Sequence, residues 1–179
     1  MKYVYRISTF KHIKEGRSYM RIRQATIPKK NNLSIFTSEI NEGVSNNQKQ
    51  IKMRSIIEAA WENRELLKDA ATIQAIEHVI EDIDKGILRV AEPTDQGDWT
   101  VNEWVKKAVV MYFPIRQMET IEVGPFEFHD KMALKRNYKE LGVRVVPHAV
   151  ARYGSFIAPG VILMPSYVNI GAYVDSGTM

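Results

Sequence analysis

The 179-residue sequence contains no cysteine, which excludes disulfide bonds, thiolate metal sites and cysteine nucleophiles from this chain. It also has no run of about 18 apolar residues, the length that a membrane-spanning helix needs, so we expect no membrane segment. Its four histidines never fall at an HxxxH spacing, so no metal site is predicted. The remaining composition, 45% hydrophobic, is typical of a soluble globular protein of one or two domains.

Acidic residues are scarce in the first 52 positions, which contain eleven Lys and Arg but only three Glu and so have a net charge of +8. Residues 53–179 contain 14 Lys and Arg and 18 Asp and Glu, which gives a net charge of −4. Three interpretations of residues 1–52 stay open: a basic arm that binds nucleic acid, an Arg-rich targeting peptide, or sequence upstream of the true start. Met53 directly precedes the first regular pattern, which favours the last. We therefore expect residues 1–52 to be a disordered basic extension or a misassigned start, and the rest to bind no nucleic acid.

Residues 53–140 are predicted to form a helical domain. The capping-box sequence from Ser55 to Glu58 predicts that a first helix begins there. A second helix is predicted from about Ala71 to Gly86, which supplies the C-terminal stop. Its apolar face consists of isoleucine and valine: Ile73, Ile76, Val79, Ile80 and Ile83. Its opposite face is acidic, and we interpret that face as solvated surface.

The second half of this domain is predicted in less detail. A short strand over residues 87–91 and a turn over 92–98 favour a small hairpin. A third helix is predicted from Asn102 to Phe113, where Pro114 ends it. Its outward lysines, Lys106 and Lys107, could hold an anionic ligand, but surface lysines are the simpler interpretation. Residues 115–140 are expected to be irregular, with a charged turn at 129–131.

Residues 154–179 repeat every six positions, and this region is the most regular part of the chain. One column of the repeat is apolar: Val150, Phe156, Ile162, Val168 and Val174. Another column holds Pro or Gly: Pro159, Pro165, Gly171 and Gly177. Neither an α-helix nor a hairpin strand has a period of six, whereas a solenoid that turns a corner every six residues does. The pattern predicts that residues 141–179 begin a parallel β-helix of hexapeptide repeats, with the apolar column toward the coil axis, so the predicted fold class is α+β.

A triangular coil of this kind takes three hexads, so residues 154–179 supply less than one and a half coils. Because about three repeats are needed for a stable solenoid, we expect the chain to be a truncated front part of a longer protein.

Arg144 stands among valines where the predicted solenoid begins. A guanidinium stays charged and has five donors to satisfy, so a buried arginine needs a partner. A ligand carboxylate held by two hydrogen bonds is one such partner, and a structural Asp or Glu is the other.

Four segments together resemble the tetrahydrodipicolinate N-succinyltransferase family. They are Gly86-Ile-Leu-Arg-Val-Ala-Glu92, Trp104-Val-Lys-Lys-Ala-Val109, Gly142-Val-Arg-Val-Val-Pro147 and the unbroken run Leu163-Met-Pro-Ser-Tyr-Val-Asn-Ile-Gly-Ala-Tyr-Val-Asp-Ser-Gly-Thr-Met179. The resemblance extends from about Met53 to Met179. The unbroken run of 17 residues is far more specific than the generic six-residue period.

The resemblance implies an acyltransferase that moves a succinyl group from succinyl-CoA to tetrahydrodipicolinate, a step of lysine and diaminopimelate biosynthesis. It further implies a cytoplasmic homotrimer with a left-handed β-helix, active sites between subunits, and succinyl-CoA as co-substrate without a bound cofactor. Arg144 matches the family's substrate-binding arginine, which would hold a carboxylate of the substrate. The family's next substrate-contacting residue, an aspartate, follows the Gly-Thr-Met motif and therefore lies beyond Met179. Asp175 is not that residue, no catalytic residue is identified here, and we expect this polypeptide alone to be inactive.

Three other functions stay open. Another hexapeptide acyltransferase, such as an N-acetyltransferase, would share the solenoid. A non-catalytic solenoid fragment that only assembles with other chains is the second alternative, because exposed coil ends associate readily. Nucleic-acid binding through residues 1–52 is the third, and it would weaken steeply with salt.

Overall fold

The computed structural model describes residues 33–179, with side chains from residue 48 onward. Residues 44–179 form one compact unit, and the residues before 44 do not belong to it. The predictions made for residues 1–32 lie outside the described residues. Among the described residues, no helix combines the length and the apolar character that crossing a membrane requires.

Helix α1 runs from Leu33 to Glu62, so the backbone of residues 33–52 is helical rather than irregular. The predicted helix start at Ser55 is wrong, because Ser55 lies inside α1 and its Oγ donates a hydrogen bond to the Lys52 carbonyl at 2.8 Å. A serine inside a helix can satisfy its hydroxyl on a carbonyl of the preceding turn. The Ser-x-x-Glu pattern therefore marks no boundary when the residues before it continue the helix.

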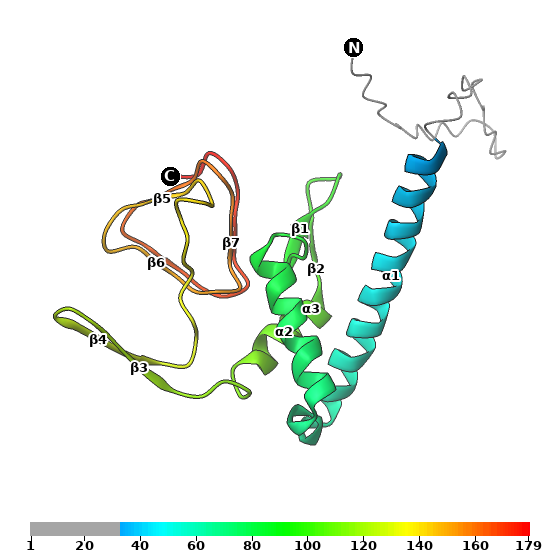
Figure 1. Cartoon of the computed structure of the whole chain (residues 1–179), viewed down its shortest axis with the longest axis horizontal. Coiled ribbons are helices and arrows are strands. Elements are labelled where there is room, and N and C mark those ends of the chain that lie inside the picture. The colour runs from blue at the N-terminus through cyan, green and yellow to red at the C-terminus, as the bar shows by residue number, and fades with distance from the viewer. Residues whose placement is uncertain (1–32) are drawn as a thin grey trace, which may run out of the picture. The chain divides into compact units, whose positions relative to one another are not determined.

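Two further helices pack with α1 in the helical region (Figure 1). A short 3-10 helix, η2 (Arg64–Lys68), leads into α2 (Ala70–Asp84), and α3 spans Glu103–Tyr112. Asp69 caps α2 by accepting a hydrogen bond from the Thr72 backbone N–H at 3.0 Å. The predicted apolar face of α2 is confirmed at four buried positions: Ile76, Val79, Ile80 and Ile83.

The predicted stop after α2 is also confirmed. Gly86 has a φ of 73°, a left-handed conformation that glycine adopts without steric cost. Its N–H donates to the Ile83 carbonyl at 3.0 Å, and the Ile87 N–H donates to the Asp82 carbonyl at 2.8 Å. These two bonds form a Schellman motif, which satisfies carbonyls at the end of the helix.

Two antiparallel hairpins flank α3 along the chain. The predicted first hairpin is present, but its strands are β1 (Ala91–Pro93) and β2 (Trp99–Val101), later than the predicted strand. The second hairpin, β3 (Glu119–Val123) with β4 (Phe126–Asp130), corrects our expectation of irregular structure and of a charged turn at residues 129–131. Its opposed pairs Ile121 with Phe128 and Val123 with Phe126 lie on one face. The alternation of these apolar residues with Glu122 and Glu127 was the sequence signal that could have predicted the hairpin.

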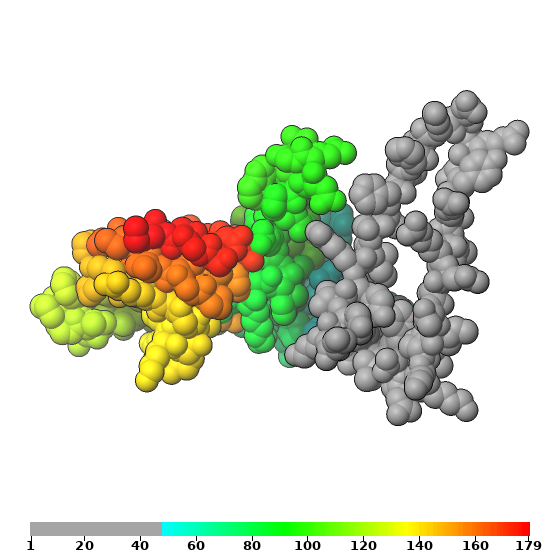
Figure 2. Space-filling model, turned by 90° about the horizontal axis from the view of Figure 1, so that it is seen from above, coloured from blue at the N-terminus to red at the C-terminus, as the bar shows by residue number. Residues whose placement is uncertain are grey.

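The C-terminal region consists of short strands that pair in parallel with the strand three positions earlier or later. The strands are β5 (Arg144–Val145), β6 (Val150–Ala151), β7 (Phe156–Ile157), β8 (Ile162–Leu163), β9 (Tyr167–Val168) and β10 (Tyr173–Val174). Strand β5 pairs with β8, β6 with β9 and β7 with β10. In Figure 1, β5, β6 and β7 lie on different sides of a closed loop of chain, and Figure 2 shows successive levels of that loop stacked from yellow to red.

The inward column of this region differs from the predicted one. In β6, β7 and β8 the most buried residues are Ala151, Ile157 and Leu163, each one position after the predicted column, whereas Val168 in β9 is buried as predicted. The reason is a step of five residues: Ile162 begins β8 and Tyr167 begins β9. A column drawn every six residues is shifted by one position after a step of five residues, so it cannot mark the inward residues on both sides of that step.

The helical region and the C-terminal strands share a packed junction. Ile170 belongs to the hydrophobic cluster of the helices. A Cβ placed on Gly154 would lie 2.8 Å from side-chain atoms of both Ile170 and Ile80, and Gly154 has a φ of +83°. Gly154 is therefore required both by its backbone conformation and by the close approach of the two regions.

Candidate functional site

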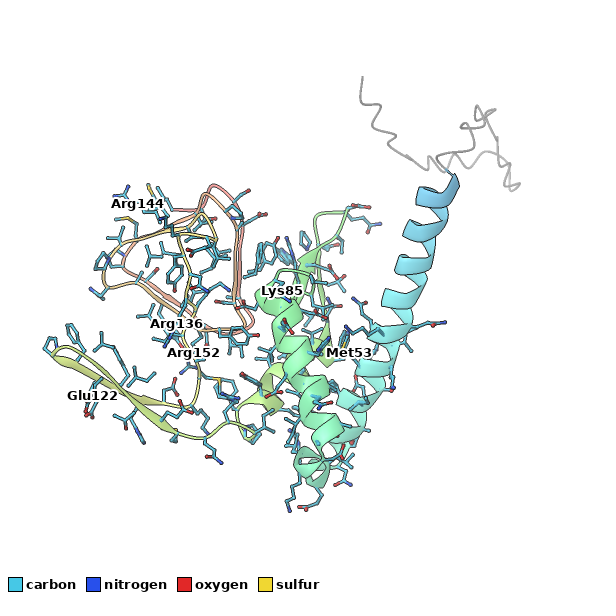
Figure 3. All side chains as sticks on the ribbon, viewed as in Figure 1. Met53, Lys85, Glu122, Arg136, Arg144 and Arg152 are labelled. Carbon is cyan, nitrogen blue, oxygen red and sulfur yellow. The ribbon has the colours of Figure 1, made fainter. Side chains whose placement is uncertain are left out.

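Arg144 opens strand β5, and its neighbours hold its backbone firmly. Its N–H donates to the Val161 carbonyl at 3.0 Å, and it pairs with Ile162 across the strands. Val143, immediately before it, is buried, whereas the Arg144 side chain is exposed. Figure 3 shows Arg144 at a corner of the loop, pointing away from it.

The exposed position of Arg144 means that its guanidinium needs no buried structural partner, because water can satisfy its donors. Within residues 48–179 its guanidinium forms no ion pair with an aspartate or glutamate. A structural partner within the described chain is therefore not what keeps this arginine in place. An accessible guanidinium on a fixed backbone can bind a carboxylate with two parallel hydrogen bonds.

Other charged residues singled out in the sequence have local partners. Lys107 forms an ion pair with Glu58 of α1 and lies 5.6 Å from the centre of the Trp61 ring, so it links α3 to α1. Asp175 accepts a hydrogen bond from the Ser176 backbone N–H at 2.8 Å, which makes it a turn residue. Neither residue presents the geometry of a ligand site.

A buried ion pair at the junction of the two regions was missed in the sequence analysis. Lys135 Nζ lies 2.6 Å from Asp84 Oδ1, and only 4% of the lysine side chain and 19% of the aspartate side chain are exposed. The same Oδ1 accepts a hydrogen bond from the Gly154 N–H at 2.8 Å. One signal was available: Asp84 follows Ile76 and Ile80 at helical spacing, so it continues the buried face of α2.

Arg152 is a second connecting residue that sequence reasoning missed. Its Nη2 donates to Asp130 Oδ2 at 2.7 Å, at the end of β4, and its Nη1 donates to Asn169 Oδ1 at 3.2 Å, one level further along the strands. Its guanidinium also lies 5.7 Å from the centre of the Tyr167 ring. The β3–β4 hairpin is therefore tied to the strands through one arginine (Figure 3).

Comparison with known proteins places these features in a family context. Residues 52–115 match the family model described as the N-terminal region of tetrahydrodipicolinate N-succinyltransferase. This match covers α2, α3 and the end of α1.

Longer matches come from individual relatives. The 2,3,4,5-tetrahydropyridine-2,6-dicarboxylate N-succinyltransferase of Paracidovorax citrulli is 53% identical over 130 residues, which cover 67% of this chain and 47% of the relative. The enzyme of the same name from Acinetobacter baylyi is 49% identical over 138 residues, covering 72% of this chain and 50% of the relative. The enzyme from Variovorax paradoxus is 48% identical over 131 residues, covering 68% and 47%.

The chain spans about half the length of the curated relatives it matches. The identity is far above the level at which only the fold is shared, and the matching model is an N-terminal one. Over about half of their length, therefore, this chain is a homologue of the tetrahydrodipicolinate N-succinyltransferases.

Proposed function

We propose that this chain contributes the N-terminal half of an enzyme that transfers a succinyl group from succinyl-CoA to the nitrogen of tetrahydrodipicolinate. The observation that carries the proposal is the identity of about 50% to succinyltransferases, together with Arg144, which is exposed and forms no ion pair within residues 48–179. In this proposal the parallel strands are the first coils of a left-handed β-helix. The protein acts in the cytoplasm as a homotrimer, and neighbouring subunits complete the site.

Acyl transfer of this kind depends more on how the enzyme positions its two substrates than on reactive side chains of the protein. Water adds across the C=N bond of the tetrahydropyridine, and the resulting amine nitrogen attacks the thioester carbonyl. The new C–N bond forms, the C–S bond breaks, and the proton that the nitrogen loses goes to the leaving CoA thiolate. This step needs an unprotonated nitrogen, a polarised carbonyl and two aligned substrates. Arg144 would hold one carboxylate of the dicarboxylic substrate and thereby orient its nitrogen.

The proposal is tested by measuring the release of the CoA thiol from an acyl-CoA donor, with tetrahydrodipicolinate as acceptor and the complete gene product as enzyme. Release with succinyl-CoA, and much less with acetyl-CoA, is the expected result. Activity with acetyl-CoA alone would indicate a different hexapeptide acyltransferase. No release with either donor would favour a non-catalytic assembly protein and overturn the proposal.

A substitution of Arg144 tests its role separately. We expect Arg144→Ala to raise KM for tetrahydrodipicolinate about 100-fold, because two charge-assisted hydrogen bonds are lost. Arg144→Lys should recover only part of this loss, since an ammonium cannot reproduce the bidentate geometry. The matched control is Arg136→Ala, another exposed arginine, which should leave KM unchanged. An equal effect of the two alanine variants would remove Arg144 from the site.

A further inference from the structure

A polar cavity of about 400 Å³ lies where α2, α3 and the chain after β6 meet. Six residues line it: Gln74, Glu77, His78, Glu81, Tyr112 and Tyr153. Its size is within the range of small-molecule pockets. The acidic face of α2, which the sequence suggested to be plain solvated surface, thus forms one wall of a cavity.

Two phenol hydroxyls in this cavity have no protein partner. Tyr112 is only 5% exposed, and Tyr153 is half-buried. Neither hydroxyl makes a hydrogen bond to another residue in the described part of the chain, yet no fully enclosed side-chain oxygen or nitrogen there lacks one. The two hydroxyls therefore open into the cavity. A nearly buried phenol without a partner is costly unless something else supplies its hydrogen bond.

The protonation state of these phenols is fixed over the physiological range. Burial raises the pKa of Tyr153 to about 12, and the nearby carboxylates of Asp84 and Glu81 add to the effect. Burial also raises the pKa of Tyr112 above its ordinary value. Both groups are neutral hydroxyls, which can accept a hydrogen bond from a cation while their rings face it.

The two glutamates of the cavity retain unused acceptor capacity. Glu81 accepts one hydrogen bond, from Lys85 at 2.5 Å, through Oε1. Glu77 forms an ion pair with Arg116 at 3.7 Å, which is longer than a hydrogen bond, and the Arg116 guanidinium lies 5.6 Å from the centre of the Tyr112 ring. A carboxylate offers about four lone-pair sites, so each glutamate can still accept from a ligand. The positions are one helical turn apart, and their side chains therefore lie on the same face.

One residue that lines the cavity, His78, already contacts an ammonium group of the protein itself. Lys49 Nζ, on α1, lies 2.7 Å from His78 Nε2. Glutamate oxygens, phenol oxygens and an imidazole nitrogen all accept hydrogen bonds, and an alkylammonium supplies three donors and a positive charge.

We propose that this cavity binds a small aliphatic amine, with its ammonium group between Glu77, Tyr112 and Tyr153. The carboxylate and the phenol oxygens accept the three N–H bonds, and the alkyl chain lies along the two rings. This inference does not rest on the proposed acyl transfer, since it uses only residues of the cavity. Because the ligand would contact α2, α3 and the chain after β6 at once, its binding should stabilise the junction of the two regions.

Calorimetric titration of the full chain with 1,5-diaminopentane tests the proposal. Saturable 1:1 binding is expected, with a rise in the thermal unfolding midpoint at saturation. Pentan-1-ol, which has the same chain length without charge, and pentanoate, which has the opposite charge, should not bind. Absence of saturable binding, or equal binding of pentan-1-ol, would overturn the proposal.

Variants locate the site. Tyr112→Phe and Tyr153→Phe keep the rings and remove the hydroxyls, and each should weaken binding roughly tenfold, since a hydrogen bond to a charged group is lost. Glu77→Gln, at an exposed side chain that folding does not need, should weaken it at least as much. The matched controls Tyr138→Phe and Glu65→Gln lie outside the cavity and should bind as the parent chain does. Unchanged affinity in the Tyr112→Phe/Tyr153→Phe double variant, or in Glu77→Gln, would place the amine elsewhere and refute the site.

Discussion

The two hydrophobic clusters of this molecule are closed in different ways. In the helical cluster the central residues of α2 are covered on all sides by α1, α3 and Ile170, and Ile76 and Ile80 are fully buried. In the strand cluster the inward residues of the first and last strands, Val145 and Val174, are only partly buried, whereas exposure is 1% at Ala151, 2% at Ile157, 5% at Leu163 and 8% at Val168.

The difference follows from architecture. Helices bury one another within a closed layer, whereas each short strand here pairs with only one other strand, three strands earlier or later. Stability should therefore be concentrated in the helical cluster and at its junction with the strands. Substitutions on the two sides of the junction can test this distribution.

The largest effect is expected from a truncation in the helical cluster. Ile80→Ala removes a fully buried side chain that also packs near Gly154, and it should lower the free energy of unfolding by about 2–5 kcal/mol. Val174→Ala, in the half-buried last strand, should cost less than about 1 kcal/mol. Urea unfolding of both variants measures the difference. An equal loss of unfolding free energy in both variants would mean that the strand cluster is packed as tightly as the helical cluster.

The next largest effect is expected at the buried ion pair between Asp84 and Lys135. Asp84→Asn leaves the lysine ammonium almost fully buried without a counter-charge, which should cost about 3 kcal/mol. Glu65→Gln is the matched control, because its partner Lys68 and Glu65 itself are both 77% exposed; such a pair contributes at most about 1 kcal/mol.

The double variant Asp84→Asn/Lys135→Met sharpens this prediction, since it removes the stranded charge as well. Denaturation should show partial recovery relative to Asp84→Asn alone. No recovery would mean that the hydrogen bond from Gly154 to Asp84, rather than the ion pair, holds the junction.

A smaller effect is expected at Arg152, which ties the β3–β4 hairpin to the strands. Arg152→Met keeps much of the aliphatic stem but loses the bonds to Asp130 and Asn169, and we expect a cost of about 2 kcal/mol. An isolated two-stranded hairpin is marginal in water, so limited proteolysis should now cut within residues 119–130. Arg136→Met, at an exposed side chain, is the comparison; equal cleavage of both variants contradicts the assignment.

The smallest effect concerns pH and the α2 carboxylates. Burial raises the pKa of Asp82 above its ordinary value of 3.8. The stability gained from its protonation is fully present below pH 3.8 and is lost as the pH rises through the raised pKa. At pH 7 the charged Asp82 therefore costs stability, and Asp82→Asn should be slightly more stable than the parent chain, with the difference vanishing in acid.

Glu81 should behave in the opposite sense. The hydrogen bond and charge of Lys85 lower the pKa of Glu81 below 4.5. Its contribution is present above pH 4.5 and is lost as the pH falls through the lowered value. Glu81→Gln should thus be slightly less stable at pH 7. Thermal unfolding between pH 3 and 7 follows both variants, and shifts of the same sign would contradict this assignment.

Several elements could be predicted from the sequence because each is specified locally. The buried face of α2 follows from the 3.6-residue spacing of Ile76, Val79, Ile80 and Ile83, and its end follows from Gly86. The short strands follow from a six-residue period that no other regular structure shares. The family resemblance was likewise carried by contiguous segments, and the comparisons confirm it.

Other features were decided only by tertiary structure. The start of the first helix depends on residues before Ser55, whose hydroxyl serves a helix that already exists. The five-residue step between β8 and β9 becomes visible only when strands pair across levels. Three contacts or shared sites join residues from different elements or from segments far apart in the chain: the ion pair of Asp84 with Lys135, the ion pair of Arg152 with Asp130, and the cavity lined by Tyr112 and Tyr153. A one-dimensional pattern records which residues share a face, but only the folded chain decides which faces meet.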